Sequence, residues 1–345
     1  MRFRILKSRR QFLQTAIFSG TSFALSGMVL AANHSTAPLT TSLIPQPDSS
    51  MIWNVAFSLL SQRMAVSAGP DEEKTSLYVN SPGAPENFQV YWSPDTEVHA
   101  VSSLAWSHNE NSLAFIGISG SRTTKTGEVC LYLLDVTSCE IRKVLKIAEQ
   151  NHGEKRHLLN VHEERAILAW FVNNKVCMPT RDKSIIAVDC NDGHIETLVP
   201  AQPCKIQGPV SVSSNKLRFL KMSSSGQGWQ LEPCEFDGSK VISKGVIPIT
   251  ADRISAFSCL SADAKYAFVG VKEKTESILD KIIIFDLSKW SSVKEIPSTA
   301  KSSSETYTYI PITVLEGKQL VLFEIIHQID KRSFKARRRL CSVNL

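Results

Sequence analysis

The sequence lacks the short motifs that mark several common classes of enzyme. A P-loop needs its second glycine five residues after the first, followed directly by a lysine. Arg122 stands five residues after Gly117, and Lys125 stands five residues after Gly120, so neither stretch qualifies. The G-x-S-x-G elbow of serine hydrolases is absent as well. The sequence therefore identifies no catalytic residue and predicts no cofactor.

A strong excess of charge of either sign is also lacking. The chain contains 39 Lys and Arg against 33 Asp and Glu, but five of the basic residues and none of the acidic ones fall within the first 31 residues. The remaining residues balance at 34 against 33. Nucleic-acid binding requires clustered basic residues, and the one basic run, Lys335 to Arg339, is interpreted as a solvated edge. No nucleic acid is predicted as a partner.

The sequence has no long apolar run after its first 31 residues. It also has no C-x-x-C pair among its cysteines. An even number of cysteines permits disulfides in an oxidising compartment. Several of them fall within predicted strands, where a buried thiol packs as a small apolar group. We therefore expect mostly free thiols, with at most one or two disulfides. The eight cysteines are Cys130, Cys139, Cys177, Cys190, Cys204, Cys234, Cys259 and Cys341.

Residues 101–145 contain four short apolar stretches separated by polar turns. Between Val129 and Leu134 the residues alternate with the period of two that is typical of a pleated strand. Strands this short do not form a stable core alone, so a group of four needs similar neighbours. The stretch predicts one four-stranded antiparallel blade of a repeating structure.

The same order of strands recurs along the chain. Six copies share an apolar opening stretch, and they begin near Trp53, Ser103, Ile167, Pro209, Ile254 and Tyr307. The predicted fold class is therefore all-β, a β-propeller of four-stranded antiparallel blades, with six blades, or seven if the interval before Trp170 holds a degenerate one. The last copy ends on its third strand, so we expect Pro38 to Ile44 to add the fourth strand and close the ring.

Two stretches resemble the W-S-P-D-G-K-x-x-A-F signature of TolB-like and WD-like propeller repeats. They are WSHNENSLAF at residues 106–115 and LSADAKYAF at residues 260–268, and both lack the proline and the glycine of the signature. The resemblance covers residues 51–345 and implies the architecture rather than a particular activity. Where such repeats close a strand before a turn, this chain has Asp135, Asp189 and Asp286.

Residues 1–31 are predicted to be an export signal. The stretch SRRQFLQ at residues 8–14 resembles the twin-arginine motif S-R-R-x-F-L-K, with Arg9, Arg10, Phe12 and Leu13 at its defining positions. The resemblance implies export to the periplasm in the folded state by the twin-arginine (Tat) translocase; the alternative is an uncleaved signal that anchors the protein in the inner membrane. Residues 32–50 are expected to form a flexible lead-in, and residues 51–345 one propeller domain.

In a propeller, the connections between blades and the turns between second and third strands share one face, where ligands usually bind. Polar residues in these segments are the candidates for ligand binding, and Trp229 joins them because polar residues surround it. The candidates are Asp71, Glu72, Arg122, Lys125, His157, His162, Glu163, Arg181, Lys272 and Trp229.

Three histidines in the connection between the second and third blades are weak candidates for metal ligands: His152, His157 and His162. Imidazoles beside carboxylates bind zinc or copper, but a spacing of five fits neither a helix nor an alternating strand. No metal site is therefore predicted.

Two classes of function remain open. The absence of catalytic motifs favours a non-catalytic binding or scaffold module for a protein, peptide or glycan, and a flat face built from several loops suits a protein or peptide partner. We expect such a protein to be monomeric. The alternative is a hydrolase or lactonase-like propeller enzyme that depends on a metal or a histidine. It requires His157 or His162 to come within about 3–5 Å of Glu163, Asp71 or Glu276, the reach of ligation or proton transfer.

Overall fold

The structure is a computed structural model in which every regular element among the described residues is a β-strand. It describes residues 42–47, 51–58, 60–61, 63–71, 73–152, 154–161, 168–213, 216–225, 228–249, 253–254, 258–261, 263–272, 281–297, 299–302, 305–315, 319–330 and 333–345. No helix in this part of the chain is long and apolar enough to cross a membrane. The export motif with Arg9, Arg10, Phe12 and Leu13 lies outside the described residues.

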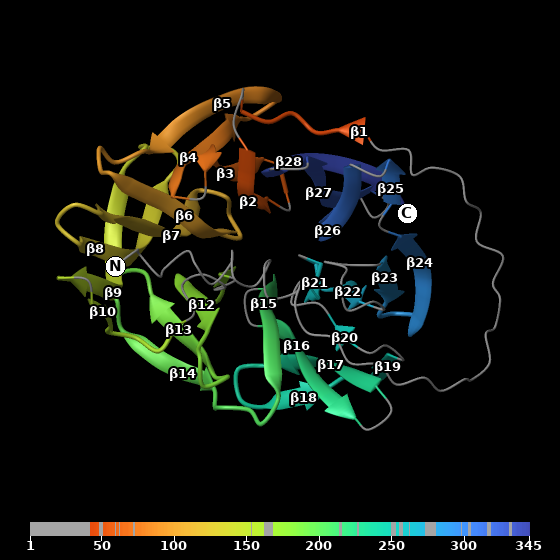
Figure 1. The fold of residues 1–345 in the computed structure, drawn as a ribbon. Coiled ribbons are helices and arrows are strands. Elements are labelled where there is room, and N and C mark those ends of the chain that lie inside the picture. Colours follow the sequence, from red (N-terminus) through yellow and green to blue (C-terminus); the bar gives the residue numbers. More distant parts are fainter. Residues whose placement is uncertain are drawn as a thin grey trace.

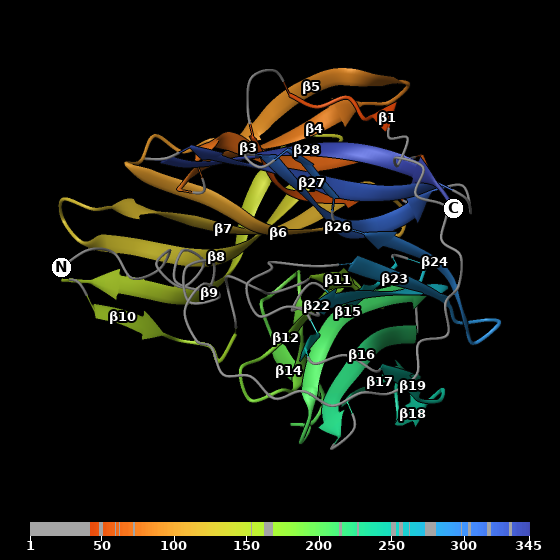
Figure 2. The same ribbon diagram turned by 45° about the vertical axis from the view of Figure 1, so that its right-hand side comes forward.

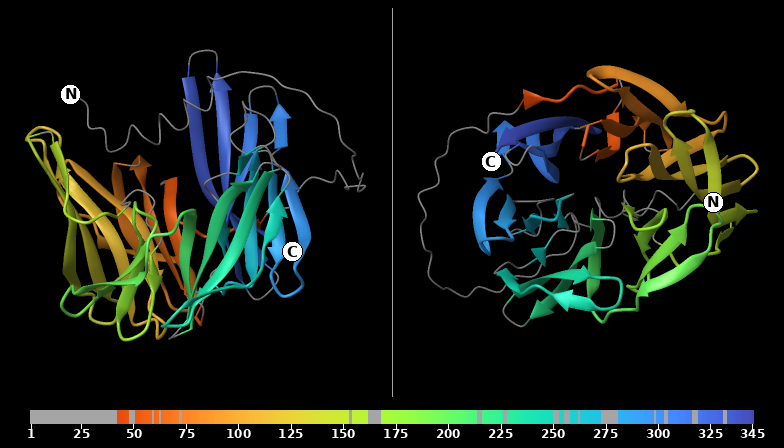
Figure 3. Two further views of the ribbon diagram at one scale, coloured as in Figure 1. Left: turned by 90° about the horizontal axis from the view of Figure 1, so that it is seen from below. Right: turned by 180° about the vertical axis from the view of Figure 1, so that it is seen from behind.

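The strands form sheets that follow one another around a ring, which Figure 1 shows face on and Figure 3 shows from below and from behind. Within each sheet most strands pair antiparallel with a strand that is adjacent along the chain. Figure 2 shows the same sheets at an angle, one beside the next. This is the propeller-like, all-β arrangement that the recurring apolar stretches predict.

The largest sheet has nine strands in the order β10-β9-β8-β7-β6-β4-β3-β2, with β5 pairing β4. Its strands are β2 (Met51–Phe57), β3 (Met64–Asp71), β4 (Lys74–Ser81), β5 (Ala84–Trp92), β6 (Val98–Trp106), β7 (Ser112–Ser121), β8 (Thr126–Asp135), β9 (Ile141–Asn151) and β10 (Glu154–His157).

The next two sheets complete the middle of the chain. One contains β11 (Ala169–Trp170), β12 (Lys175–Pro179), β13 (Ile185–Asp189) and β14 (Ile195–Val199). The other contains β15 (Lys205–Ser213), β16 (Lys216–Ser225), β17 (Gly228–Phe236), β18 (Val241–Ser243) and β19 (Ile247–Ile249).

The last two sheets close the ring. One contains β20 (Arg253–Ile254), β21 (Cys259–Leu260), β22 (Tyr266–Lys272), β23 (Lys281–Asp286) and β24 (Ser291–Pro297). The other contains β25 (Thr299–Ser302), β26 (Glu305–Leu315), β27 (Gln319–Asp330), β28 (Ser333–Asn344) and, from the start of the chain, β1 (Ser42–Leu43).

The expected six or seven separate blades are not what the described residues form. They form four sheets of four or five strands and one sheet of nine. The nine-stranded sheet contains both copies that open at Trp53 and Ser103, because a parallel bridge between Lys74 and His99 joins β4 to β6. Backbone pairing therefore continues from one repeat to the next at this place, and the simple count of copies was wrong.

The start of the chain pairs with its end. Ser42 lies opposite Ser342, and Leu43 lies opposite Cys341, in an antiparallel ladder between β1 and β28. The amide of Ile44 donates to the carbonyl of Leu340 at 3.2 Å. β1 is the outermost strand of this sheet and its fifth, because residues 299–344 already supply four strands; the sequence predicts it as the fourth.

Apolar side chains fill the spaces between successive sheets. Trp106 and Trp170 belong to this core and are 9% and 7% exposed. The indole Nε1 of Trp106 donates to the carbonyl of Ala56 at 3.1 Å, so the opening strand of one copy is fastened to that of the preceding copy. Trp53 is half-buried, with the guanidinium of Arg338 4.5 Å above its ring centroid.

The aspartates at strand ends shape one repeated turn. The carboxylate of Asp135 accepts the amide of Thr137 at 2.9 Å, and that of Asp286 accepts the amide of Ser288 at 2.8 Å. Asp189 does the same with Asn191 at 2.8 Å. Such Asx turns reverse the chain tightly, which explains why this residue type recurs between the third and fourth strands.

Two segments that the sequence places in turns or connections are largely β-strand where the structure describes them. Strands β7 and β8 pair as far as Ser121 and Thr126, which leaves a turn of four residues. The connection that contains His152 and His157 includes the end of β9 and all of β10, which pair with each other. In each hairpin the backbone N–H and C=O groups pair with one another, and exposed side chains are polar in hairpins as they are in loops. The polarity of these segments therefore did not distinguish a hairpin from a loop.

Candidate functional site

Turns and connections from neighbouring repeats come together above β4, β6, β7 and β8. Glu97 precedes β6, and its Oε2 accepts hydrogen bonds from Ser121, Arg122 and Thr123 in the turn between β7 and β8, at 2.8–3.2 Å. The amide of His99 donates to the carbonyl of Glu73, between β3 and β4, at 2.9 Å. We call this group of segments (residue 73 and residues 93–99 and 121–126) the loop face.

The hydrogen bonds to Glu97 favour its ionised form. The amide of Thr123, followed by the hydroxyl of Ser121 and the amide of Arg122, holds the pKa of Glu97 below its ordinary value, although partial desolvation acts the other way. The carboxylate therefore fixes the β7–β8 turn at neutral pH.

Arg122 forms an ion pair with Glu73 that links two repeats. Their side chains are 49% and 21% exposed, so the pair lies at the surface rather than in the core. Arg122 was predicted as a ligand-binding residue from its place in the chain. The structure puts it on the loop face, where its charge is already neutralised by a carboxylate.

His157 and Arg181, both predicted site residues, meet on the next part of the ring. Nη2 of Arg181 lies 3.1 Å from Nε2 of His157. Arginine carries no acceptor, so the imidazole nitrogen accepts. The amide of Arg181 donates to the carbonyl of Asn160 at 2.7 Å, and Val161 forms a bridge with Thr180. The segment after β10 is thereby fastened to the turn between β12 and β13.

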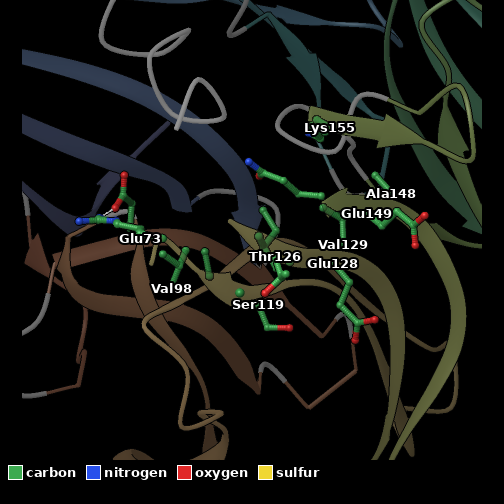
Figure 4. A pocket seen from close by; sticks show the side chains of 15 residues that line it. Glu73, Val98, Ser119, Thr126, Glu128, Val129, Ala148, Glu149 and Lys155 are labelled. Atoms are coloured by element: carbon green, nitrogen blue, oxygen red, sulfur yellow. Dashed lines mark ion pairs between the residues drawn. The ribbon is translucent and has the colours of Figure 1, made fainter. Parts of the chain in front are cut away.

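A hollow of about 560 Å³, its open mouth included, opens beside the loop face. In Figure 4, Glu73 and Val98 lie on one side of it, and Val129, Ala148 and Glu149 lie on the other. Its accessible wall is almost wholly apolar. The lining residues come from β6, β7, β8, β9 and β10 and from the turns between β3 and β4 and between β7 and β8.

Neighbouring cations neutralise the two carboxylates on the far rim of the hollow. Glu128 pairs with Lys143 at 2.5 Å, and Glu149 pairs with Lys146 at 2.7 Å. The hydrogen bond to Glu128 raises the pKa of Lys143, and the hydrogen bond from Lys146 lowers the pKa of Glu149. Lys143 and Glu149 are accordingly charged at neutral pH.

Gln150 lines the hollow and was not predicted from the sequence. Its residue is 8% exposed, and its Oε1 is buried without a hydrogen-bond partner among the described residues. A buried acceptor without a donor costs free energy, on the order of 1–3 kcal/mol. No sequence signal marked it, because a glutamine near a strand end is an ordinary surface residue.

Of the remaining predicted residues, Lys125 belongs to the loop face and Asp71 borders it, whereas Trp229 lies in another sheet. Asp71 is exposed at the end of β3, and its Oδ1 accepts the amide of Glu73 at 2.8 Å. Lys125 is exposed in the β7–β8 turn. Trp229 in β17 is half-buried and packs against the core cluster around Leu231. Lys272 ends β22, and Glu72, His162 and Glu163 lie outside the described residues.

The weak metal candidates do not form a cluster within the described part of the chain. His152 is exposed in the turn between β9 and β10 and has φ 50°, while His157 contacts Arg181. No group of three or more His, Cys, Asp or Glu side chains suited to a metal ion occurs among the described residues. His162 falls outside them, so its part in this hypothesis stays a prediction.

The eight cysteines are all described, and all are free thiols. Burial raises the pKa of Cys130 to about 11 and that of Cys190 and Cys341 to about 12. These thiols stay protonated at neutral pH, so they act as small apolar core groups rather than as nucleophiles.

The fold and the site together define a β-propeller-like protein with an apolar hollow on its loop face. Among solved structures, it is similar to the β-propeller domain of Myceliophteria thermophila Cps50 (Swd1), at 11% identity and a TM-score of 0.45, covering 89% of this chain and 100% of that one. It is also similar to a prolyl endopeptidase, at 13% identity and a TM-score of 0.39, covering 81% of this chain but 39% of that one.

The chain thus spans well under half of the prolyl endopeptidase chain that it matches. No model of a protein family matches this chain, and no curated protein does. At such low identities and TM-scores, neither similar structure carries an argument about activity. The assignment of the fold therefore rests on the sheets themselves.

Proposed function

We propose that this protein is an exported, TolB-like or WD-like propeller that binds a partner through its loop face without catalysing a reaction. The partner is a protein, peptide or glycan. The observation that carries the proposal is the apolar hollow beside a loop face whose turns are fixed by hydrogen bonds and ion pairs. Ligand pockets of proteins are concave and mostly apolar, as this hollow is.

Hydrogen bonds and an ion pair hold the loop face in one conformation, and this order supports a binding role. Glu97 holds one turn, Arg122 and Glu73 join two repeats, and His157 and Arg181 join the next two. A surface that is already ordered loses little conformational entropy on binding, which leaves more of the contact energy for affinity.

Site-specific photo-crosslinking tests this role. Thr124 is exposed at the tip of the loop face, whereas Thr137 is exposed in the turn at the other end of β8. With p-benzoylphenylalanine at either position in producing cells, we expect a discrete crosslinked product from position 124 and none from position 137. Equal products from both positions, or none from 124, would contradict a partner on this face.

The alternative enzyme, a metal- or histidine-dependent hydrolase, rests on His162 and Glu163 together with His157. Two of these residues lie outside the described part of the chain, and the third contacts Arg181. No described contact favours this alternative, and it stays a prediction from the sequence.

We further propose export to the periplasm by the twin-arginine translocase, on the evidence of the motif at residues 8–14. Replacing both Arg9 and Arg10 by Lys is expected to stop export, because the receptor reads the arginine pair. The measurement is the amount of protein in periplasmic and cytoplasmic fractions. A single Arg4→Lys substitution, outside the motif, is the control and is expected to leave export intact. Periplasmic accumulation of the double variant would show that the signal belongs to another route.

A further inference from the structure

A buried carboxylate in the sheet of β15–β19 is surrounded by three cations. Glu235 in β17 is 3% exposed. Its Oε1 lies 3.4 Å from Nζ of Lys216 and 3.1 Å from Nζ of Lys244, and its Oε2 lies 3.0 Å from Nη2 of Arg218. The cations come from β16 and from the residue after β18, the two strands that flank this part of β17 (Figure 1). We call these four residues the Glu235 cluster.

Glu235 is ionised in this setting. Desolvation acts to raise its pKa, but the hydrogen bonds from Lys244 and Arg218 together outweigh it and hold the pKa of Glu235 below its ordinary value. Lysine and arginine side chains are protonated at neutral pH. Three positive charges therefore share one negative charge, which leaves a surplus of two.

Two of the cations are crowded together and open to solvent. Because Nζ of Lys216 and Nζ of Lys244 lie beside the same oxygen of Glu235, they are no farther apart than these two distances together. Like charges this close repel each other. Their side chains are 46% and 40% exposed, so an anion from solution reaches both and relieves the repulsion by bridging them. Arg218 is fixed from the neighbouring sheet, since its Nη1 donates to the carbonyl of Ala264 at 3.3 Å.

Two other carboxylates that stand near the cluster have partners of their own. Asp263, the residue before Ala264, pairs with Lys265 at 3.5 Å. Asp237 accepts the amide of Lys240 at 3.1 Å and interacts with the charge of the same lysine. In the described part of the chain, Glu235 is the one acid that forms ion pairs with the three cations of the cluster. The surplus of positive charge is therefore left for a ligand.

The size of the surplus selects among anions. A carboxylate or a phosphate diester brings one negative charge, whereas a phosphate monoester brings about −1.5 to −2 near neutral pH, with three acceptor oxygens on one phosphorus atom. Charge-assisted hydrogen bonds from ammonium groups to such oxygens are among the stronger ones in proteins. A phosphoryl group thus matches both the charge of the cluster and its pair of neighbouring donors.

We infer that the Glu235 cluster binds the phosphoryl group of a phosphate monoester between the ammonium groups of Lys216 and Lys244. The inference goes beyond the proposed function, because the cluster belongs to another sheet than the loop face does. Inorganic phosphate carries the same chemistry, so the probes must distinguish the two sources.

Titration calorimetry with small anions tests the ligand class. The probes are methyl phosphate, inorganic phosphate, dimethyl phosphate and acetate. With the purified protein at pH 7 and constant ionic strength, we expect saturable binding of methyl phosphate. Dimethyl phosphate and acetate should bind more weakly by about tenfold or more, because each brings one negative charge. Inorganic phosphate should bind within about threefold of methyl phosphate, because the bridging oxygens are the same.

The charge of the probe gives a second readout. The second pKa of a phosphate monoester is about 6, so binding of methyl phosphate should be about tenfold weaker at pH 5 than at pH 7. Glu235 stays ionised over this range, because its pKa is lowered. Sulfate keeps both of its charges between these two pH values. Its binding should therefore stay constant, which controls for a change in the protein itself.

Three variants assign the binding to the cluster. Lys216→Gln and Lys244→Gln each remove one bridging cation and should weaken binding of methyl phosphate by about tenfold or more. Lys240→Gln is the matched control, since it removes the same charge from the exposed turn after β17 and should bind as the unmodified protein does. Thermal unfolding of each variant verifies that it is folded.

Each other outcome would overturn a stated part of the inference. Equal binding of methyl phosphate, dimethyl phosphate and acetate would overturn the selection of a doubly charged anion, and binding of inorganic phosphate alone would overturn the monoester. Unchanged binding in both Lys216→Gln and Lys244→Gln, or an equal loss in Lys240→Gln, would overturn the cluster as the site. No saturable binding of methyl phosphate would overturn the inference as a whole. The crosslink from position 124 reports on the loop face, so the proposed function is tested separately.

Discussion

At the scale of the residue, one carboxylate fixes the turn that borders the hollow. Glu97 accepts hydrogen bonds from three consecutive residues, Ser121, Arg122 and Thr123. These bonds lower its pKa, so the folded state binds a proton less readily than the unfolded chain does. Its stabilising effect is therefore present above the ordinary carboxyl pKa of about 4.3 and is lost as the pH falls through the lower folded value.

We predict that amide hydrogen exchange of Arg122 and Thr123 becomes faster as the pH falls below about 4, after correction for the intrinsic rate. Glu97→Gln should exchange fast at every pH, because a neutral amide replaces the charged acceptor. Glu140, an exposed carboxylate, supplies the control variant Glu140→Gln, which should keep the pH dependence. A pH dependence that survives in Glu97→Gln would show that another group holds the turn.

The residues of the site were predicted only in part. Arg122, His157 and Arg181 were chosen because they stand in turns and connections, and the structure brings the last two into contact. Gln150 was missed because its burial comes from the pairing of β8, β9 and β10, which no local pattern of residues reports. The ion pair between Glu73 and Arg122 likewise joins residues from different repeats.

At the scale of the element, the turn between the third and fourth strands of a repeat has the same backbone conformation in three sheets. The residue four positions after the aspartate has a positive φ: Cys139 at 61°, Gly193 at 78° and Trp290 at 53°. This left-handed conformation costs most residues about 1–2 kcal/mol, whereas glycine adopts it freely.

We predict opposite effects from exchanging the residue types in two of these turns. Gly193→Ala should lower the free energy of unfolding by about 1–2 kcal/mol, since its Cβ would also lie 2.9 Å from the carbonyl oxygen of Val144. Cys139→Gly should raise it by about 0.5–1 kcal/mol, because the relief of strain exceeds the entropy that glycine adds to the unfolded chain. Urea unfolding measures both effects.

Cys139→Ala keeps the strained conformation and serves as the control, with an expected change within about 0.5 kcal/mol. If Cys139→Gly were no more stable than Cys139→Ala, the turn would not be under strain.

The aspartates of these turns were recognisable from the sequence, because an Asx turn is a local structure. The hairpins β7–β8 and β9–β10 were not, because their pairing depends on register between strands.

At the scale of the whole molecule, the two ends of the described chain share one core. Ile44 packs against a cluster formed by Ile52, Met64 and Val66 of the first strands and by Val321 and Leu340 of the last. The short strand β1 thus lies at the seam between the first and the last sheets. The sequence predicted this seam from a final repeat of three strands, whereas the last sheet takes four strands from the end of the chain and β1 as its fifth.

We predict that the pairing of β1 with β28 contributes to the stability of the ring. Ile44→Pro removes the N–H that donates to Leu340 and most of the apolar contact, so we expect a loss of about 2–3 kcal/mol in the free energy of unfolding. Amides of β28 should also exchange faster, because their partner strand no longer pairs. Leu43→Ala, at a side chain that is 63% exposed, is the matched control and should change stability by less than about 0.5 kcal/mol. If Ile44→Pro unfolds at the same urea concentration as Leu43→Ala, and β28 keeps its protection, then β1 does not hold the ring closed. In that case the seam depends on the direct packing of the first sheet against the last.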